Sequence, residues 1–168
     1  MGYTTDFYGQ IEINPPLDSE MVEYINKLAS TRRMKRDSEK LMELYHGENG
    51  LNGSYGVDGE YFVGGLGSFG QDSDESVLST NGSPSTQPGL WLQWNITEDG
   101  KFIQWDEGEK FYNATEWMEY VISLISENHV CNGTIEARGE DPSDHWLLKV
   151  ENNIVSEDEY SYVSKIVK

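Results

Sequence analysis

Two apolar runs around an Asp-Gly dipeptide are the feature that most constrains the fold of this chain. Residues 90–97 and 101–105 flank Asp99-Gly100, a dipeptide that favours the type I′ turn of a β-hairpin. With a two-residue loop, the register places matching residues opposite each other: Glu98 and Lys101, Ile96 and Ile103, Trp94 and Trp105. Each such pair stabilises a sheet by roughly 0.2–1 kcal/mol. The sequence therefore predicts a hairpin at 90–105.

An amphipathic helix is predicted near the N-terminus. Asp18 is a residue type that caps helix N-termini, and apolar residues follow it at helical spacing through 21–29. We expect this helix to run into the basic residues at 31–36, where positive charge complements the C-terminal end of the helix dipole.

A second main helix is predicted after the hairpin. It is expected to begin at Asn113, with Glu116 as the partner residue of a capping box. Apolar side chains at 117, 120, 121, 124 and 125 form one stripe along it. A shorter helix is predicted at 38–45.

Strand signals elsewhere complete an α+β pattern. They lie at 4–13, 60–63, 133–138, 145–151 and 160–167. The economical packing for this order is a mainly antiparallel sheet with the two main helices packed on one face. The length of 168 residues fits a single domain spanning 1–168, with a flexible Gly/Ser-rich segment at about 47–89. Within that segment, 71–89 is expected to be a long exposed loop.

Charge is the strongest signal in the composition. Thirty acidic and twelve basic residues give a net charge of -18, yet six of the twelve bases lie within residues 27–40. An acidic surface repels nucleic acid and membranes and attracts basic partners. It is interpreted either as a means of solubility or as an imitation of a polyanion. The cluster of Arg32, Arg33, Lys35 and Arg36 either stabilises the C-terminal end of the helix or binds a phosphate or an acidic partner.

Three tryptophans of the hairpin region are candidate binding residues. Trp91, Trp94 and Trp105 supply large rings that either pack in the core or build an aromatic pocket. Trp91 and Trp94 have opposite parity on one strand, so both cannot point into the same core. We expect one of them to lie on the other face of the sheet or beneath the long loop, available to a ligand or partner.

Signals for catalysis, metals and cofactors are weak. Residues 65–70 have G-x-G-x-x-G spacing, but they lead into a loop without the helix and acidic residue that a dinucleotide site needs. The three histidines stand apart, and the clustered acids at 72–75 and 140–144 lack calcium-loop spacing. We therefore interpret 65–70 as a glycine turn, and we expect no cofactor, no metal site and no catalytic constellation.

Localisation is expected to be cytoplasmic. The first residues show no basic segment followed by an apolar stretch, and no apolar run approaches the ~20 residues that cross a bilayer. Cys131 is the single cysteine, which is typical of a reducing compartment. No membrane contact and no direct nucleic-acid contact are expected.

Four strings carry a resemblance to other proteins: TRRMKRD at 31–37, QPGLWLQWNITEDG at 87–100, WDEGEKFYNATEWMEY at 105–120 and GTIEARGEDPSD at 133–144. Together they resemble a group of small uncharacterised proteins of tailed bacteriophages and bacterial genomes. The chain departs from that group at Ala137, where an aromatic is frequent, and at His145-Trp146, where a Gly-containing segment is usual. The resemblance implies a phage accessory protein in the cytoplasm of a host bacterium.

Two functional hypotheses follow, and a third interpretation is a structural component of the virion or of the cell. The first is a non-enzymatic, acidic accessory protein that binds and inhibits a host or anti-phage defence component with a basic surface, as a nucleic-acid mimic, with the basic cluster orienting the complex. The alternative is a small-ligand module that sequesters or processes a nucleotide-like signal. It would use the tryptophan hairpin for stacking and the basic cluster for phosphate. The sequence leaves the oligomeric state open.

Overall fold

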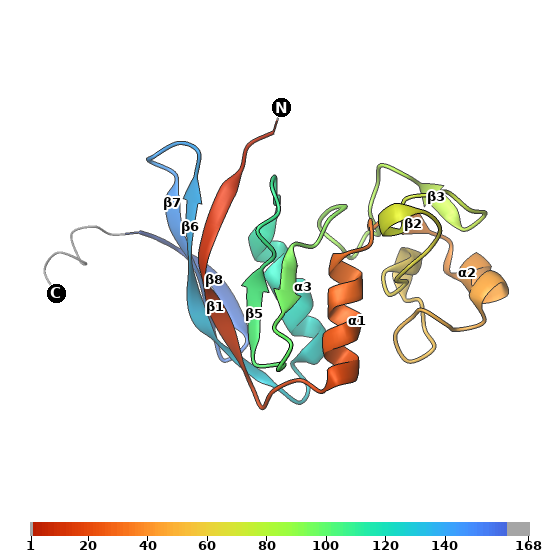
Figure 1. The fold of residues 1–168 in the computed structure, drawn as a ribbon, viewed down its shortest axis with the longest axis horizontal. Helices are drawn as coiled ribbons and strands as arrows, with labels where there is room; N and C mark the ends of the chain where they lie inside the picture. The colour runs from red at the N-terminus through yellow and green to blue at the C-terminus, as the bar shows by residue number, and fades with distance from the viewer. Residues whose placement is uncertain (1, 161–168) are drawn as a thin grey trace, which may run out of the picture.

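Six antiparallel strands form the main sheet, and the computed structural model describes residues 2–160 (Figure 1). The strand order is β4-β5-β1-β6-β7-β8. The bounds are β1 Thr5–Asn14, β4 Trp94–Ile96, β5 Phe102–Trp105, β6 Val130–Gly139, β7 His145–Glu151 and β8 Ile154–Glu159. Helices α1 (Ser19–Ala29) and α3 (Ala114–Ile125) cover one face of this sheet. The predicted α+β class, with two main helices on one face of a mainly antiparallel sheet, is confirmed.

The remaining elements form a smaller lobe, residues 31–89, on the side of α1 that faces away from the sheet (Figure 1). The lobe contains β2 (Lys35–Arg36) paired with β3 (Val77–Ser79), helix α2 (Ser38–Tyr45), and short 3-10 helices at Val57–Gly59 and Ser68–Gly70. Its own apolar cluster consists of Leu41, Tyr55 and Phe62, with Tyr45 packed against them. The segment at 47–89 lies in this lobe; its flexibility and the single-domain assignment stay predictions.

The main core fills the space between the sheet and the two helices. Alternation along β1 turns Phe7, Ile11 and Ile13 inward, and the apolar stripes of α1 and α3 meet them. The rings of Phe7, Trp94 and Phe111 pack edge to face, with centroids 5.1 to 5.8 Å apart. Such aromatic pairs favour one arrangement of the core beyond the area that they bury.

The predicted hairpin register is confirmed for its two apolar pairs, Trp94 with Trp105 and Ile96 with Ile103. The turn is not the expected type I′, which needs a positive φ at both central residues. Only Gly100 of the two has one, at +76°, and its amide donates to the Thr97 carbonyl (2.9 Å). The Asn152-Asn153 turn between β7 and β8 does have a positive φ at both residues.

Helix positions follow the local sequence signals, while the helix ends differ. The Asp18 side chain caps α1, and α2 has the predicted bounds. Helix α1 ends at Ala29, so the basic residues at 31–36 lie beyond it. At the start of α3, Asn113 has a left-handed backbone and its side chain donates to the Pro88 carbonyl (2.9 Å), so the expected capping box does not form.

One strand prediction and one loop prediction differ from the structure, and one further strand prediction lies outside the described residues. Residues 60–63 form turns instead of a strand, because the 3-10 helix Val57–Gly59 leads directly into them. The segment at 71–89, expected to be a loop, contains β3. The last strand predicted at 160–167 lies outside the described residues apart from Tyr160, and the strand after the Asn152-Asn153 turn is β8.

Candidate functional site

Arg33, the centre of the predicted basic cluster, points into the protein and is only 2% exposed. Its Nη2 donates to the Glu60 carbonyl (2.8 Å) and its Nε donates to Gln87 Oε1 (3.2 Å). Desolvation lowers the pKa of Arg33 to about 10, so the guanidinium stays charged at neutral pH. A side chain without exposed surface cannot touch a partner. The binding role expected of Arg33 is therefore replaced by a structural one.

Arg36 is equally buried, at 2% exposure. Its Nη1 donates to Ser76 Oγ (2.9 Å) and to both carboxylate oxygens of Asp74 (3.3 Å), while its guanidinium lies over the Phe62 ring. Burial alone would raise the pKa of Asp74, but hydrogen bonds from Ser76 and Tyr45, together with the charge of Arg36, lower it. Arg36 therefore stabilises the smaller lobe from within and is not available to bind a phosphate or an acidic partner.

Arg32 and Lys35 are half-buried and also engaged within the smaller lobe. Arg32 donates to the Thr80 carbonyl (3.1 Å) and to Asn81 Oδ1 (3.2 Å), and Lys35 lies 3.9 Å from the Asp58 carboxylate. All four cations of the predicted cluster therefore contact residues of the lobe that they belong to. The chain does not present them as one free basic patch.

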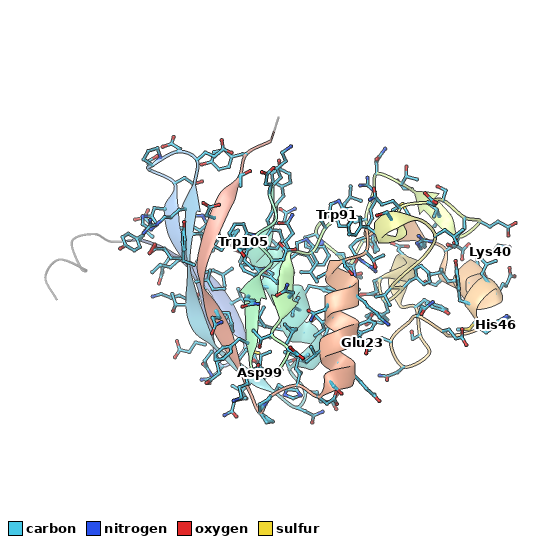
Figure 2. All side chains as sticks on the ribbon, viewed as in Figure 1. Glu23, Lys40, His46, Trp91, Asp99 and Trp105 are labelled. Carbon is cyan, nitrogen blue, oxygen red and sulfur yellow. The ribbon has the colours of Figure 1, made fainter. Side chains whose placement is uncertain are left out.

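The three predicted tryptophans lie in different environments. Trp94 is fully buried in the core, and its Nε1 donates to the Ala114 carbonyl (2.8 Å). Trp105 is half-buried and packs against Phe7 at 5.6 Å between ring centroids. Trp91 lies at the junction of the main body and the smaller lobe (Figure 2), where it pairs with Phe69 at 6.3 Å. Of the three, Trp91 is the one placed for contact with a ligand or partner.

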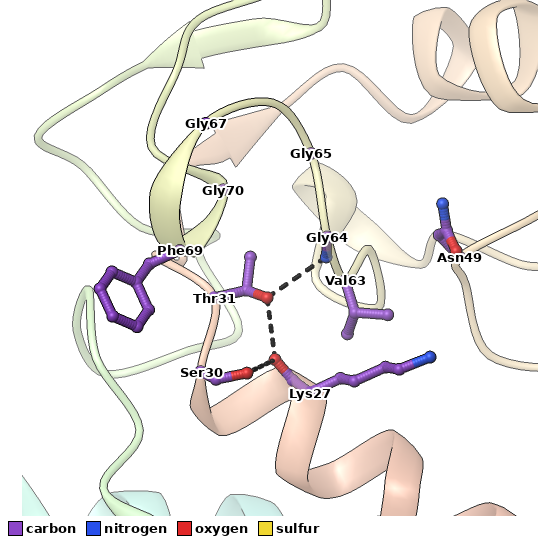
Figure 3. Close-up of a pocket in the computed structure, with 10 residues that line it drawn as sticks. All are labelled: Lys27, Ser30, Thr31, Asn49, Val63, Gly64, Gly65, Gly67, Phe69 and Gly70. Atoms are coloured by element: carbon purple, nitrogen blue, oxygen red, sulfur yellow. Dashed lines mark hydrogen bonds between the residues drawn. The ribbon is translucent and has the colours of Figure 1, made fainter.

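Two neighbouring cavities lie at the C-terminal end of α1, and both have Ser30 and Phe69 in their walls. The glycine cavity has a volume of about 390 Å³ and is walled by the glycine-rich loop at 64–70 (Figure 3). The tryptophan cavity has a volume of about 250 Å³ and is walled by Trp91 and the loop at 106–108. We call the two together the α1 groove.

The glycine cavity is built by a loop that closes onto the end of α1. The Gly64 amide donates to Thr31 Oγ1 (3.2 Å), and the Thr31 hydroxyl donates to the Lys27 carbonyl (2.8 Å; Figure 3). Gly70 has a φ of +60°, and a Cβ there would lie 2.0 Å from the Gly64 carbonyl oxygen. The interpretation of 65–70 as a glycine turn agrees with this geometry, since a 3-10 turn and no α-helix follows Gly67.

The tryptophan cavity is lined by hydrogen-bond acceptors. Gln93 Nε2 donates to the Glu109 carbonyl (3.0 Å), which leaves Gln93 Oε1 buried and without a hydrogen-bond partner. The Asp106 carboxylate accepts the Gly108 amide (2.7 Å), and desolvation of the carboxyl raises the pKa of Asp106, although the residue as a whole is exposed. A Cβ at Gly108 would lie within 2.8 Å of both Gln93 Oε1 and Asp106 Oδ1. The two acceptors therefore lie close together beside Gly108, and Gln93 Oε1 itself has no exposed surface.

The sequence reasoning missed Phe69, Gln93, Asp106 and Gly108 of this site, and Phe69 is the most exposed large side chain among them. It is 60% exposed and has a left-handed backbone (φ +59°), a conformation that costs a bulky residue free energy. Glu107, next to Asp106, is also left-handed (φ +67°). The sequence signal that could have identified Phe69 was its position as a lone aromatic residue inside a glycine-rich segment.

Two searches of the described residues, 2–160, gave negative results. No group of three His, Cys, Asp or Glu side chains there is arranged to hold a metal ion. None of the helices in that range has the length and apolar character needed to cross a membrane. Comparisons with protein-family models, with curated proteins and with solved structures found no match to this chain.

Proposed function

We propose that this protein is a non-enzymatic phage accessory protein that binds a basic surface of a host or anti-phage defence protein and inhibits it as a nucleic-acid mimic. The observation that supports this best is the excess of exposed carboxylates in a chain with a net charge of -18. Arg33 and Arg36 are enclosed together with Glu60 and Asp74, so the basic cluster does not offset these carboxylates as one cationic patch on the surface.

Exposed carboxylates surround the molecule on several elements. They lie on the loop before α3, on the loop between β6 and β7, and on β8: Asp106, Glu107, Glu109, Glu140, Asp141, Glu157, Asp158 and Glu159. An acidic surface of this kind accelerates encounter with a basic groove and weakens as salt screens it over about 8–10 Å. The same field repels nucleic acid, so a protein partner is the better supported one.

The nucleotide-binding alternative has less support. It needs the basic cluster for phosphate and the hairpin tryptophans for stacking, whereas Arg33, Arg36 and Trp94 are buried. A nucleotide detected by mass spectrometry in natively purified protein would favour this alternative.

A pull-down from bacterial lysate at about 0.05 M and about 0.5 M salt tests the leading proposal. We expect a nucleic-acid-binding protein to be captured at low salt, released at high salt and displaced by duplex DNA. A bait with the exposed acids of 106–109 and β8 changed to amides should capture less, whereas the matched bait Asn128→Ala, which changes an exposed neutral residue, should capture as much as the wild type. Capture that is indifferent to both salt and DNA would contradict the proposal.

A further inference from the structure

We propose that the tryptophan cavity binds the guanidinium of an arginine side chain presented by the basic protein partner. This inference rests on the proposed function and names the chemical group that anchors the complex. It is carried by the Asp106 carboxylate and the Trp91–Phe69 ring pair, which line the same cavity.

The polar wall of the cavity favours a ligand that donates hydrogen bonds. Gln93 Oε1 has no exposed surface and no hydrogen-bond partner, so it places a partial negative charge behind the cavity wall. The Gln93 amide group is held in this orientation because its Nε2 donates to the Glu109 carbonyl. Asp106 adds a carboxylate whose Oδ1 is fixed by the Gly108 amide. A guanidinium offers several N–H donors in one plane and can donate two of them to the Asp106 carboxylate.

The apolar wall fits the same group. Trp91 and Phe69 meet nearly at right angles, with an interplanar angle of 82°, and both line the cavity. Guanidinium planes stack on aromatic rings and are only weakly hydrated, so they enter such sites more readily than an ammonium does. Phe69 is 60% exposed, so its ring is accessible to a side chain that enters the cavity.

The surrounding charge favours a cation and disfavours an anion. The cavity includes Ala29 and Ser30 at the C-terminal end of α1, the negative pole of the helix dipole. Glu107 and Glu109 flank Asp106 on the same exposed loop. The neighbouring cation Lys27 is already paired with Glu23 at 3.1 Å. These negative charges would repel a phosphate, whereas an arginine side chain would neutralise them.

The test is an NMR titration of the full chain, labelled with ¹⁵N, using the capped peptide acetyl-Gly-Arg-Gly-amide. Two matched probes replace arginine with citrulline, which keeps the shape without the charge, or with lysine. We expect saturable shifts of the Trp91 indole, the Gln93 side-chain amide and the Gly108 amide with the arginine peptide, and about tenfold weaker binding of the citrulline peptide. The lysine peptide should bind more weakly than the arginine peptide.

Variants locate the binding. Asp106→Asn and Gly108→Ala should each weaken the arginine peptide about tenfold, the second because its Cβ would displace both acceptors. Glu98→Gln removes one exposed carboxylate in the turn beside Asp99, at the opposite end of α1 from Trp91 (Figure 2), and should leave binding unchanged. Unperturbed ¹⁵N spectra elsewhere will show that each variant is folded.

The outcomes separate this inference from the proposed function. Equal binding of all three peptides, or shifts outside the tryptophan cavity, would overturn the arginine site. If an Asp106→Asn bait captures a DNA-displaceable partner as well as the wild type does, the arginine anchor is wrong and the acidic inhibitor stands. If the arginine peptide binds in the cavity but no basic protein is captured, the proposed function fails while the site is supported.

Discussion

The side-chain amide of Asn26 forms two hydrogen bonds with the backbone of Ile96. It pairs with Ile96 as one residue of a neighbouring strand would. Asn26 Nδ2 donates to the Ile96 carbonyl (3.0 Å), and the Ile96 amide donates to Asn26 Oδ1 (2.8 Å). Since β4 is an edge strand of the sheet, this pairing closes a place where another chain could add. It also fixes α1 against the edge of the sheet.

Asn26→Ala should lower the free energy of unfolding by about 2–3 kcal/mol, because both Ile96 backbone groups lose their partner. Urea denaturation followed by tryptophan fluorescence measures this. The matched control is Asn128→Ala, an exposed asparagine whose replacement should cost less than about 0.5 kcal/mol. Equal losses in the two variants would show that the edge pairing contributes nothing.

Adjacent arginines should differ in their contribution to stability. Arg33→Met removes a buried guanidinium from Glu60 and Gln87 and should cost roughly 3–5 kcal/mol. Arg32→Met removes a half-buried side chain that contacts the loop at 80–81, and should cost less than about 1 kcal/mol. The comparison uses thermal and urea denaturation of both variants. A small effect of Arg33→Met would refute the structural role assigned to it.

Acid should release the Arg36–Asp74 contact. The folded-state pKa of Asp74 is lowered from its ordinary value of 3.8, so its contribution is complete above that value and is lost as pH falls through the lower, folded-state pKa. At neutral pH, Asp74→Asn should cost about 3 kcal/mol, and the difference from the wild type should shrink below pH ~4. Urea midpoints across pH measure this. The control Glu75→Gln, at a side chain 75% exposed, should cost less than about 1 kcal/mol at neutral pH.

The glycine loop offers a matched test of steric closure. Gly70→Ala and Gly53→Ala both place alanine at a positive φ, of +60° and +77°, but only Gly70 faces a carbonyl oxygen at 2.0 Å. Gly53→Ala should therefore cost about 1 kcal/mol from the backbone alone. Gly70→Ala should cost at least about 2 kcal/mol more, because the loop must move away from Gly64. ¹⁵N shifts at Thr31 and Gly64 will report the displacement, and similar costs for both variants would contradict the close packing.

Local patterns in the sequence determined which segments became helices and strands. The apolar pairs around Asp99-Gly100 set the β4–β5 register, and Asp18 set the start of α1, because both depend on residues close together in the chain. The same reasoning missed the end of α1. The Thr31 hydroxyl bonds back to Lys27, and the Arg33 amide donates to the Leu90 carbonyl, a contact that the spacing of apolar residues does not reveal.

The candidate site depended on tertiary structure. A run of four cations looks like a surface patch until the partners of each are known, and those of Arg33 and Arg36 lie up to 54 residues away. The tryptophan cavity joins Phe69, Trp91 and Asp106 from three separate segments. Composition and periodicity determined the acidic α+β character of this protein. Burial and long-range hydrogen bonding, which depend on the packed fold, decided which charges and rings reach the surface.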